Sequence, residues 1–219
     1  MDYSQTSLFK ESIDISNVSD DIQGFMSMSL NMLDADVTLF CHLFTPEESD
    51  RLFEVLLKEI KWRQNKMKIY GKEVNLPRKT AWYGDQNKSY TFSGIHLRPE
   101  SWTNTLHEIK QRIESISSVT FNSVLLNLYR DGKDSISWHT DAEPELGENP
   151  VIGSVSFGGT RRFVFRYQQD HKLKKEVALT HGSFLLMAGA TQHCWQHQIP
   201  KTAKKVSPRI NLTFRTILD

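Results

Sequence analysis

One short stretch of the sequence combines residue types that bind metals. In W-H-T-D, His139 and Asp141 lie two positions apart, and side chains with that spacing on an extended strand point to the same face. Another histidine, His197, follows further along the chain. Two histidines and one carboxylate on one face of an octahedral metal leave positions open for a co-substrate and O2 on non-haem iron. Because His-x-Asp is a common chance pairing, this hypothesis needs support from the rest of the chain.

A second group of polar side chains shares the inward faces of two strand-like stretches. Alternation places them together: Asn127, Tyr129, Arg209, Asn211, Thr213 and Arg215. Two arginines facing a closed interior are costly unless they meet anions. A dicarboxylate co-substrate and Asp141 would supply those anions, and a guanidinium fork suits a carboxylate. Each arginine alone fits a surface position, but the pair downstream of a His-x-Asp…His set favours an anion site.

Composition and charge limit the classes of protein. The 219 residues fit one domain with a sizeable core. The two cysteines, Cys41 and Cys194, have no paired spacing, which argues against a disulfide framework or a thiolate zinc site and indicates an intracellular protein. No leader or bilayer-spanning segment is predicted, so we expect no membrane partner. With a net charge of +1, nucleic acid would have to be held by local basic patches.

The first part of the chain predicts a lead-in, a strand and a helix. Residues 1–36 are rich in Ser and Asp without a sustained period, and we expect them to be loosely ordered. A single domain is expected over residues 37–219, beginning with a strand at 37–44. Thr45 then has the properties of an N-cap before Pro46 and two acids, so a helix is predicted to about Lys61.

The second half predicts a β-rich core. A helix is expected over 101–118, with Ser101 as its cap. After it the pattern alternates in short stretches, at 121–129, 136–139, 151–157, 162–167, 175–179, 182–187, 193–198 and 208–215. Eight short strands without an intervening helix indicate a jelly roll, or double-stranded β-helix, over 121–216. The fold class is therefore mainly β with flanking helices (α+β).

A basic stretch at 61–79 precedes this core. Its basic residues alternate with aromatic and aliphatic ones. They are Lys61, Arg63, Lys66, Lys68, Lys72, Arg78 and Lys79. Such a hairpin suits a phosphate-lined surface, with an aromatic side chain wedged between bases. It equally fits a solvated two-stranded edge protected by lysines, and composition alone slightly favours that edge.

Ordered motifs over most of the chain resemble the AlkB-type Fe(II)- and 2-oxoglutarate-dependent nucleic-acid dealkylases. The similarity runs from about Lys66 to Leu218 and is carried by P-R-K-T-A-W-Y-G-D, Y-T-F-S-G, L-N-L-Y-R-D-G, H-T-D-A-E, S-V-S-F-G, F-V-F-R, H-G-S, W-Q-H and P-R-I-N-L-T-F-R. It looks strongest toward the branch that repairs double-stranded DNA, given I-Y-G-K, P-R-K and Y-T-F-S-G. The resemblance implies oxidative demethylation of bases such as 1-methyladenine and 3-methylcytosine. Fe(II), 2-oxoglutarate and O2 would be used, and succinate, CO2 and formaldehyde released.

The resemblance also implies roles for the residues of the core. His139, Asp141 and His197 would bind iron, and Arg215 would brace Asp141 as part of the catalytic set. Arg209 would bind the distal carboxylate of 2-oxoglutarate, in a site lined by Asn127, Tyr129, Asn211, Thr213 and Arg215. His193 precedes W-Q-H, but it does not occupy the ligand's place in that motif, so we expect a structural or supporting role.

Substrate-binding residues are implied mainly within 61–93, the expected nucleotide-recognition hairpins. Tyr90 and Phe92 would line the pocket for a flipped base, with Phe92 stacked on it across from His139. Glu143 would accept a hydrogen bond from an exocyclic amine, and Tyr70 would fill the gap left in the duplex. The substrate set expected from these motifs also includes Arg78, Ser93 and Arg166.

Two departures from the family pattern bear on the substrate. Duplex-repair members carry a longer basic loop after F-V-F-R, whereas here the stretch 167–177 is short and offers His171, Lys172, Lys174 and Lys175. Ala142 also stands where such enzymes often have an acid. The alternatives are the same chemistry on RNA or single-stranded DNA, and, more remotely, a non-catalytic jelly-roll binding module whose metal set is vestigial. We expect a monomer acting on alkylated DNA, located in the cytoplasm if bacterial and in the nucleus if eukaryotic.

Overall fold

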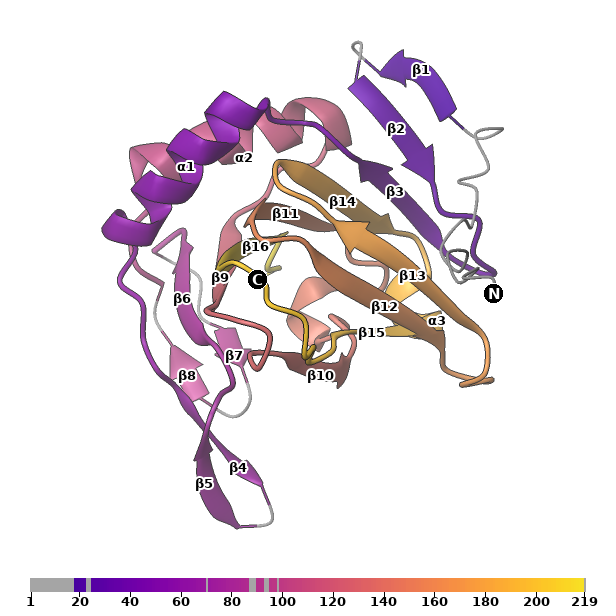
Figure 1. Cartoon of the computed structure of the whole chain (residues 1–219). Coiled ribbons are helices and arrows are strands. Elements are labelled where there is room, and N and C mark those ends of the chain that lie inside the picture. Colours follow the sequence, from indigo (N-terminus) through magenta and orange to yellow (C-terminus); the bar gives the residue numbers. More distant parts are fainter. Residues whose placement is uncertain are drawn as a thin grey trace, which may run out of the picture.

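Two β-sheets packed face to face form the body of the protein, and two helices cover the outer face of the larger sheet (Figure 1). The computed structural model describes residues 18–22, 25–69, 71–86, 90–92, 95–97 and 99–218. Its strands are β1 (Val18–Ile22), β2 (Phe25–Ser29), β3 (Asp36–Phe40), β4 (Lys66–Ile69), β5 (Lys72–Asn75), β6 (Lys79–Gly84), β7 (Tyr90–Phe92), β8 (Ile95–Leu97), β9 (Ser123–Tyr129), β10 (Ile136–His139), β11 (Ile152–Gly158), β12 (Arg161–Tyr167), β13 (Lys174–Leu179), β14 (Ser183–Ala188), β15 (Trp195–Ile199) and β16 (Arg209–Arg215). The helices are α1 (Pro46–Glu59), α2 (Asn104–Ser117) and α3 (Thr191–Cys194), with one 3-10 turn at Pro144–Leu146.

The sheet order confirms the predicted jelly roll. The larger sheet runs β1-β2-β3-β14-β11-β16-β9-β6, and the smaller runs β10-β15-β12-β13. The paired strands of both sheets are antiparallel. Strands distant in sequence, such as β9 and β16, therefore lie side by side and present their inward faces to one cavity.

Alternation along β9 and β16 divides the interior into two cores. On β16, Ile210, Leu212 and Phe214 pack toward the helices, together with Leu52 of α1 and Ile109 of α2. The intervening residues of β16 point between the sheets, where the second core contains residues such as Phe165 and Leu185. This arrangement gives the polar face of β16 a closed interior to line.

The two long helices begin with side-chain caps, one of them where the sequence predicted. In α1, the Thr45 hydroxyl accepts from the Glu48 N–H at 3.2 Å, while Glu48 accepts from the Thr45 N–H at 2.9 Å. The second helix starts later than expected, because Thr103 rather than Ser101 is its cap. The chain there is held extended by β6, since the Glu100 N–H donates to the Trp82 carbonyl at 2.9 Å.

The end of the expected lead-in is instead part of the larger sheet. Strand β2 pairs with β3, and Ser27 is buried. Further on, the Leu33 carbonyl accepts from Trp195 Nε1 at 2.7 Å and Asp34 accepts from the Tyr167 hydroxyl at 2.8 Å. These partners lie more than a hundred residues away in sequence, so local periodicity did not reveal them. Residues 1–17 lie outside the described part of the chain.

A short helix interrupts the strand predicted at 193–198. Thr191–Cys194 forms α3, and β15 begins only at Trp195. The expectation of eight strands without a helix between them is therefore wrong at this point.

Within the described ranges, none of the helices combines the length and the apolar character required to cross a membrane.

Candidate metal and co-substrate site

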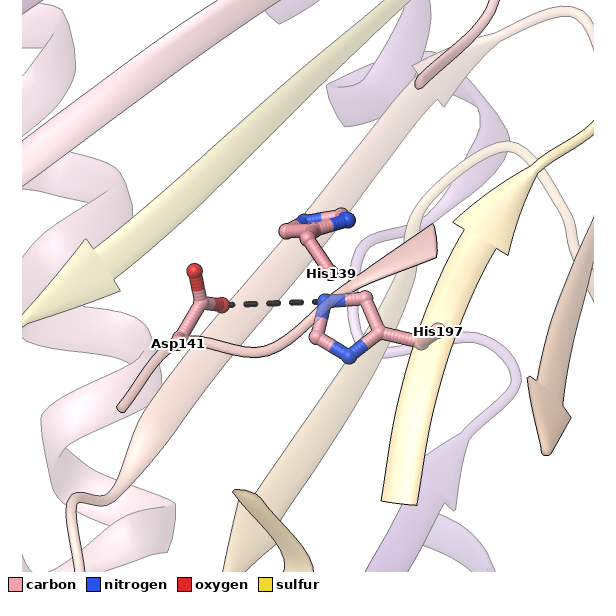
Figure 2. Close-up of side chains that lie close together, drawn as sticks. All are labelled: His139, Asp141 and His197. Carbon is pink, nitrogen blue, oxygen red and sulfur yellow. Dashed lines mark ion pairs between the residues drawn. The ribbon is translucent and has the colours of Figure 1, made fainter. Parts of the chain in front are cut away.

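Three potential metal ligands come together between the two sheets. His139 ends β10 and pairs across the sheet with His197 of β15, while Asp141 lies just beyond the strand end (Figure 2). Each offers one ligand atom, and these atoms lie within 4.8 Å of one another. His-x-Asp thus spans the end of a strand, and cross-strand pairing brings the distant histidine to it.

The two histidines are oriented by their surroundings, and burial keeps His197 neutral. His139 Nδ1 lies 2.8 Å from the Ser137 carbonyl; a carbonyl can only accept, so Nδ1 is the donor and Nε2 is the ring nitrogen available as a ligand atom. His197 is 3% exposed. Burial, together with neighbouring His139, lowers the pKa of His197 to about 3. A neutral imidazole is the form that binds a metal.

Asp141 is braced by a buried arginine. Arg215 donates to Asp141 Oδ1 at 2.7 Å, and Oδ2 lies 3.8 Å from His197 Nε2. Burial alone would raise the pKa of the Asp141 carboxyl, but the charge of Arg215 and its hydrogen bond outweigh burial and hold the pKa well below its usual range. The carboxylate is therefore ionised, with one oxygen held by Arg215 and the other directed toward the histidines.

Arg209 supplies an anion-binding group in the same cavity. It is 1% exposed, and its Nη2 donates to the Ser156 hydroxyl at 2.9 Å. Nε and Nη1 are buried without a hydrogen-bond partner among the described residues. Burial lowers the pKa of Arg209 to about 10, so the guanidinium is charged at neutral pH. A buried cation with two unused donors fits a carboxylate ligand.

All six residues predicted for the co-substrate site line this cavity. Its complete lining is Leu125, Asn127, Tyr129, Ile136, His139, Asp141, Ser154, Phe163, Met187, His197, Ile199, Arg209, Asn211, Thr213 and Arg215. Asn211 donates to Ser154 and to the Val155 carbonyl, and it accepts from Thr213. The Asn211 amide is thus fixed to the cavity wall, whereas Arg209 retains free donors.

Neither of the two arginines expected to contact substrate, Arg78 and Arg166, lines this cavity. Arg78 is 4% exposed and donates to Asn127 Oδ1 at 2.7 Å, so it supports the cavity wall. Arg166 is absent from the cavity lining. Its guanidinium lies 4.4 Å from the Trp138 ring centroid and hydrogen-bonds Gln196, on the outer face of the smaller sheet. Strand alternation explains this position, because Phe165, the neighbour of Arg166 on β12, points inward.

Glu143 lies just past the metal-binding stretch, before the 3-10 turn. Its Oε2 is buried and lacks a hydrogen-bond partner within the described part of the chain. His193 contacts the Glu148 carbonyl, which fits a structural role.

Two residues predicted to contact substrate, Tyr70 and Ser93, lie outside the described residues. Tyr90 and Phe92 belong to β7, which pairs with β8. The structure describes the backbone of these two residues but not their side chains.

The basic stretch forms the expected hairpin, β4–β5, with Gly71 at a φ of 78° in its turn. Several of its cations are already paired. Lys61 and Arg63 bind Glu100 at 2.8 and 2.9 Å, and Lys66 binds Glu73 at 3.2 Å. The basic surface available to phosphate is therefore smaller than the sequence suggested.

Sequence reasoning missed residues that complete the site. Arg161 is buried over the Tyr129 ring, at 5.6 Å from its centroid, and donates to three carbonyls. Its alternation with Phe163 and Phe165 could have indicated an inward position. Gln192 accepts a hydrogen bond from the Asp141 N–H at 2.9 Å, and no local pattern indicates that contact.

A jelly roll that encloses two histidines, a carboxylate and a buried arginine with free donors defines an oxygenase that uses Fe(II) and 2-oxoglutarate. Comparison with known proteins agrees, because a family model described as the 2OG-Fe(II) oxygenase superfamily matches residues 36–215. The chain belongs to this superfamily, as an AlkB-type member.

Individual relatives cover most of the chain. Alpha-ketoglutarate-dependent dioxygenase alkB homolog 3 of Mus musculus is 41% identical over 90% of this chain and 72% of the relative. DNA oxidative demethylase ALKBH2 is 40% identical in Bos taurus, over 85% of this chain and 69% of the relative. In Homo sapiens it is 41% identical, over 80% and 71%. The solved structure of OsALKBH1 shares the fold, with a TM-score of 0.61 and 16% identity over 85% of this chain and 99% of that chain.

Proposed function

We propose that this protein is a dioxygenase that demethylates alkylated bases in DNA, and that its substrate is the duplex form. The observation that carries the chemistry is Arg209, whose buried guanidinium keeps two unused donors in the cavity that contains His139, Asp141 and His197. A dicarboxylate bound there would reach both the arginine and a metal. The relatives named DNA oxidative demethylase support DNA as the substrate.

Each side chain of the cavity has a role in this proposal. His139, Asp141 and His197 would hold Fe(II), and Arg209 would bind the distal carboxylate of 2-oxoglutarate. When bound, iron with 2-oxoglutarate and O2 supplies the oxidation of an N-methyl group, whose hydroxylated product loses formaldehyde. The apolar side chains of Phe163 and Met187 help to exclude water from the cavity.

Base recognition would be the task of Glu143 and the β7–β8 hairpin. The unpartnered Glu143 Oε2 would accept from the exocyclic amine of 1-methyladenine or 3-methylcytosine. By resemblance, Tyr90 and Phe92 would enclose the flipped base. Extrusion from the stack costs a few kcal/mol, and less for a lesion that cannot pair, which favours damaged over normal bases.

The duplex preference rests on the β4–β5 hairpin. It projects from the body of the protein, toward the same lower side of the view as β10, which ends at His139 (Figure 1). By resemblance, Tyr70 would fill the gap that the flipped base leaves. As a repair enzyme, the protein would work as a monomer in the compartment that holds DNA.

One observation favours a second candidate, the same chemistry on single-stranded DNA or RNA. Glu100 pairs with Lys61 and Arg63, and Glu73 pairs with Lys66, so fewer hairpin cations are left to hold the phosphates of two strands. A non-catalytic binding module is disfavoured, because such a module has no need of buried donors that await a carboxylate.

The test compares one methylated sequence as a single strand, a duplex and an RNA. Succinate and formaldehyde release would be measured for the iron-loaded protein, with His197→Ala as the inactive control. Fastest turnover on the duplex supports the proposal. Faster turnover on RNA or the single strand would replace it with the second candidate. A metal-bound protein that releases formaldehyde from none of the three would overturn both.

A further inference from the structure

The main chain of Asp141 is held by a side chain and not by a strand. β10 ends at His139, so the chain has left the smaller sheet when it reaches Asp141. The Asp141 N–H instead donates to Gln192 Oε1 at 2.9 Å, in a contact between residues 51 positions apart. Asp141 is 3% exposed and Gln192 is 1% exposed, so water is a poor substitute for this acceptor.

The oxygen and the nitrogen of the Gln192 amide each contact a partner. Its Nε2 lies 3.6 Å from the sulfur of Met187, which lines the cavity. This contact orients the amide with its oxygen toward Asp141. If the amide were turned over, Nε2 would face the Asp141 N–H, donor against donor. The direction of the Gln192 amide therefore follows from its two neighbours.

Gln192 is placed by a short helix that is itself fixed. In α3, the Thr191 hydroxyl accepts from the Asp36 N–H at 3.0 Å, which ties the helix to β3. The chain enters β15 immediately after α3, and His197 follows within that strand. The segment 191–197 therefore contacts Asp141 through Gln192 and contributes His197 directly.

We propose that Gln192 is a positioning residue for the metal. By holding the Asp141 main chain, it sets the distance between the carboxylate and the two histidines. The inference rests on the proposed function only in taking His139, Asp141 and His197 as the metal ligands. Residues that orient metal ligands typically change metal affinity by about 10- to 100-fold when mutated.

Metal affinity of the folded protein tests this directly. Mn(II) would be titrated, in place of Fe(II), into wild type, Gln192→Leu and Gln192→Asn, with calorimetric detection. Leucine removes the acceptor at similar volume, and asparagine shortens its reach. Both variants should bind Mn(II) about 10- to 100-fold more weakly. Saturating Fe(II) should restore most of the turnover, since the ligands themselves remain.

A matched control is Gln196→Leu. Gln196 is likewise a glutamine close to a metal ligand, but it is half-buried and hydrogen-bonds Arg166 on the outer face of the sheet. Its variant should bind Mn(II) like wild type. If Gln192→Leu does not fold, as judged by thermal unfolding without metal, Gln192→Asn decides the question.

Two results are distinguishable. Wild-type Mn(II) affinity in a folded Gln192 variant would overturn the positioning role and leave the proposed function intact. Weakened affinity in these variants, together with a wild-type protein that demethylates no oligonucleotide, would overturn the proposed function and leave the positioning role intact.

Discussion

Arg215 donates a hydrogen bond to Asp141 Oδ1 across 2.7 Å, between two side chains that are almost completely buried. The pair keeps the carboxylate ionised before any metal arrives, and it leaves Oδ2 on the side of the histidines. Asp141 therefore has two functions, one toward the metal and one toward Arg215. Neither histidine neutralises a buried cation in the way that Asp141 neutralises Arg215. Substitution of Asp141 should therefore affect stability differently from substitution of the histidines.

Alanine at each metal ligand should separate these functions. His139→Ala, Asp141→Ala and His197→Ala should all abolish iron-dependent 2-oxoglutarate turnover. Only Asp141→Ala should also destabilise the metal-free protein by about 3 kcal/mol, because it leaves Arg215 without its buried carboxylate. Turnover assays and urea unfolding without metal provide the two measurements. Activity in any of the three variants would contradict the ligand assignment, and equal stability would contradict the role of the ion pair.

Arg209→Lys should raise the concentration of 2-oxoglutarate required for half-maximal turnover. A lysine ammonium cannot reproduce the two unused donors of the guanidinium fork. Loss of a charged hydrogen bond is worth about 1.5–3 kcal/mol, which corresponds to about a ten- to hundredfold increase. DNA affinity should remain near that of wild type. Unchanged co-substrate saturation would show that the carboxylate binds elsewhere.

Glu143→Ala should change lesion preference. Repair of 1-methyladenine and 3-methylcytosine, which present an exocyclic nitrogen, should slow more than repair of lesions without one. The reason is the buried Glu143 Oε2, which lacks a partner within the described residues. Competition between the two lesion types measures the effect, with Glu145→Ala as a neighbouring control. An equal loss on every lesion would indicate that Glu143 acts on the fold or on iron.

Tyr70→Ala should separate duplex from single-strand repair. A flipped base leaves a gap in a duplex, and aromatic stacking in that gap is worth about 1–3 kcal/mol. Repair of a methylated duplex should therefore fall by about one to two orders of magnitude, while the same lesion in a single strand should be repaired within a few-fold of wild type. Repair rates measured on the methylated duplex and on the methylated single strand decide between a duplex and a single-strand substrate. Parallel losses, or none on duplex, would make Tyr70 an ordinary edge residue.

The pair Arg130–Asp134 predicts a pH dependence of stability away from the metal. Burial works to raise the pKa of Asp134, but hydrogen bonds from Arg130, at 2.8 Å, outweigh it and lower the pKa. A lowered folded-state pKa stabilises the protein above the unfolded pKa of about 4, and this contribution is lost as pH falls. Arg130→Ala should cost about 1 kcal/mol at pH 7.

That difference from wild type should shrink progressively below about pH 5. Urea unfolding between neutral and acid pH measures it. The control is Lys58→Ala, which breaks an exposed pair with Glu54 and should change stability by less than about 0.5 kcal/mol at any pH. A difference for Arg130→Ala that stays constant with pH would mean that the arginine acts through packing alone.

Strand alternation explains why much of the site was predictable. Arg209, Asn211, Thr213 and Arg215 were assigned to one face by a period of two, and all four line the cavity. The N-cap at Thr45 was also predictable from the sequence, because it depends on residues within one helical turn. The start of α2 was not, since β6 holds Glu100 extended through a contact that is distant in sequence.

The sequence by itself determined the residue types of the metal site and the faces they occupy, because period and spacing are local properties of the chain. Only the tertiary structure decided which charges are available. It placed Glu100 against Lys61 and Arg63, and it buried Arg78 against Asn127. The same holds for the contact of Gln192 with Asp141. These pairings join residues far apart in the chain, so their energies depend on distances and burial that exist only once the two sheets have packed.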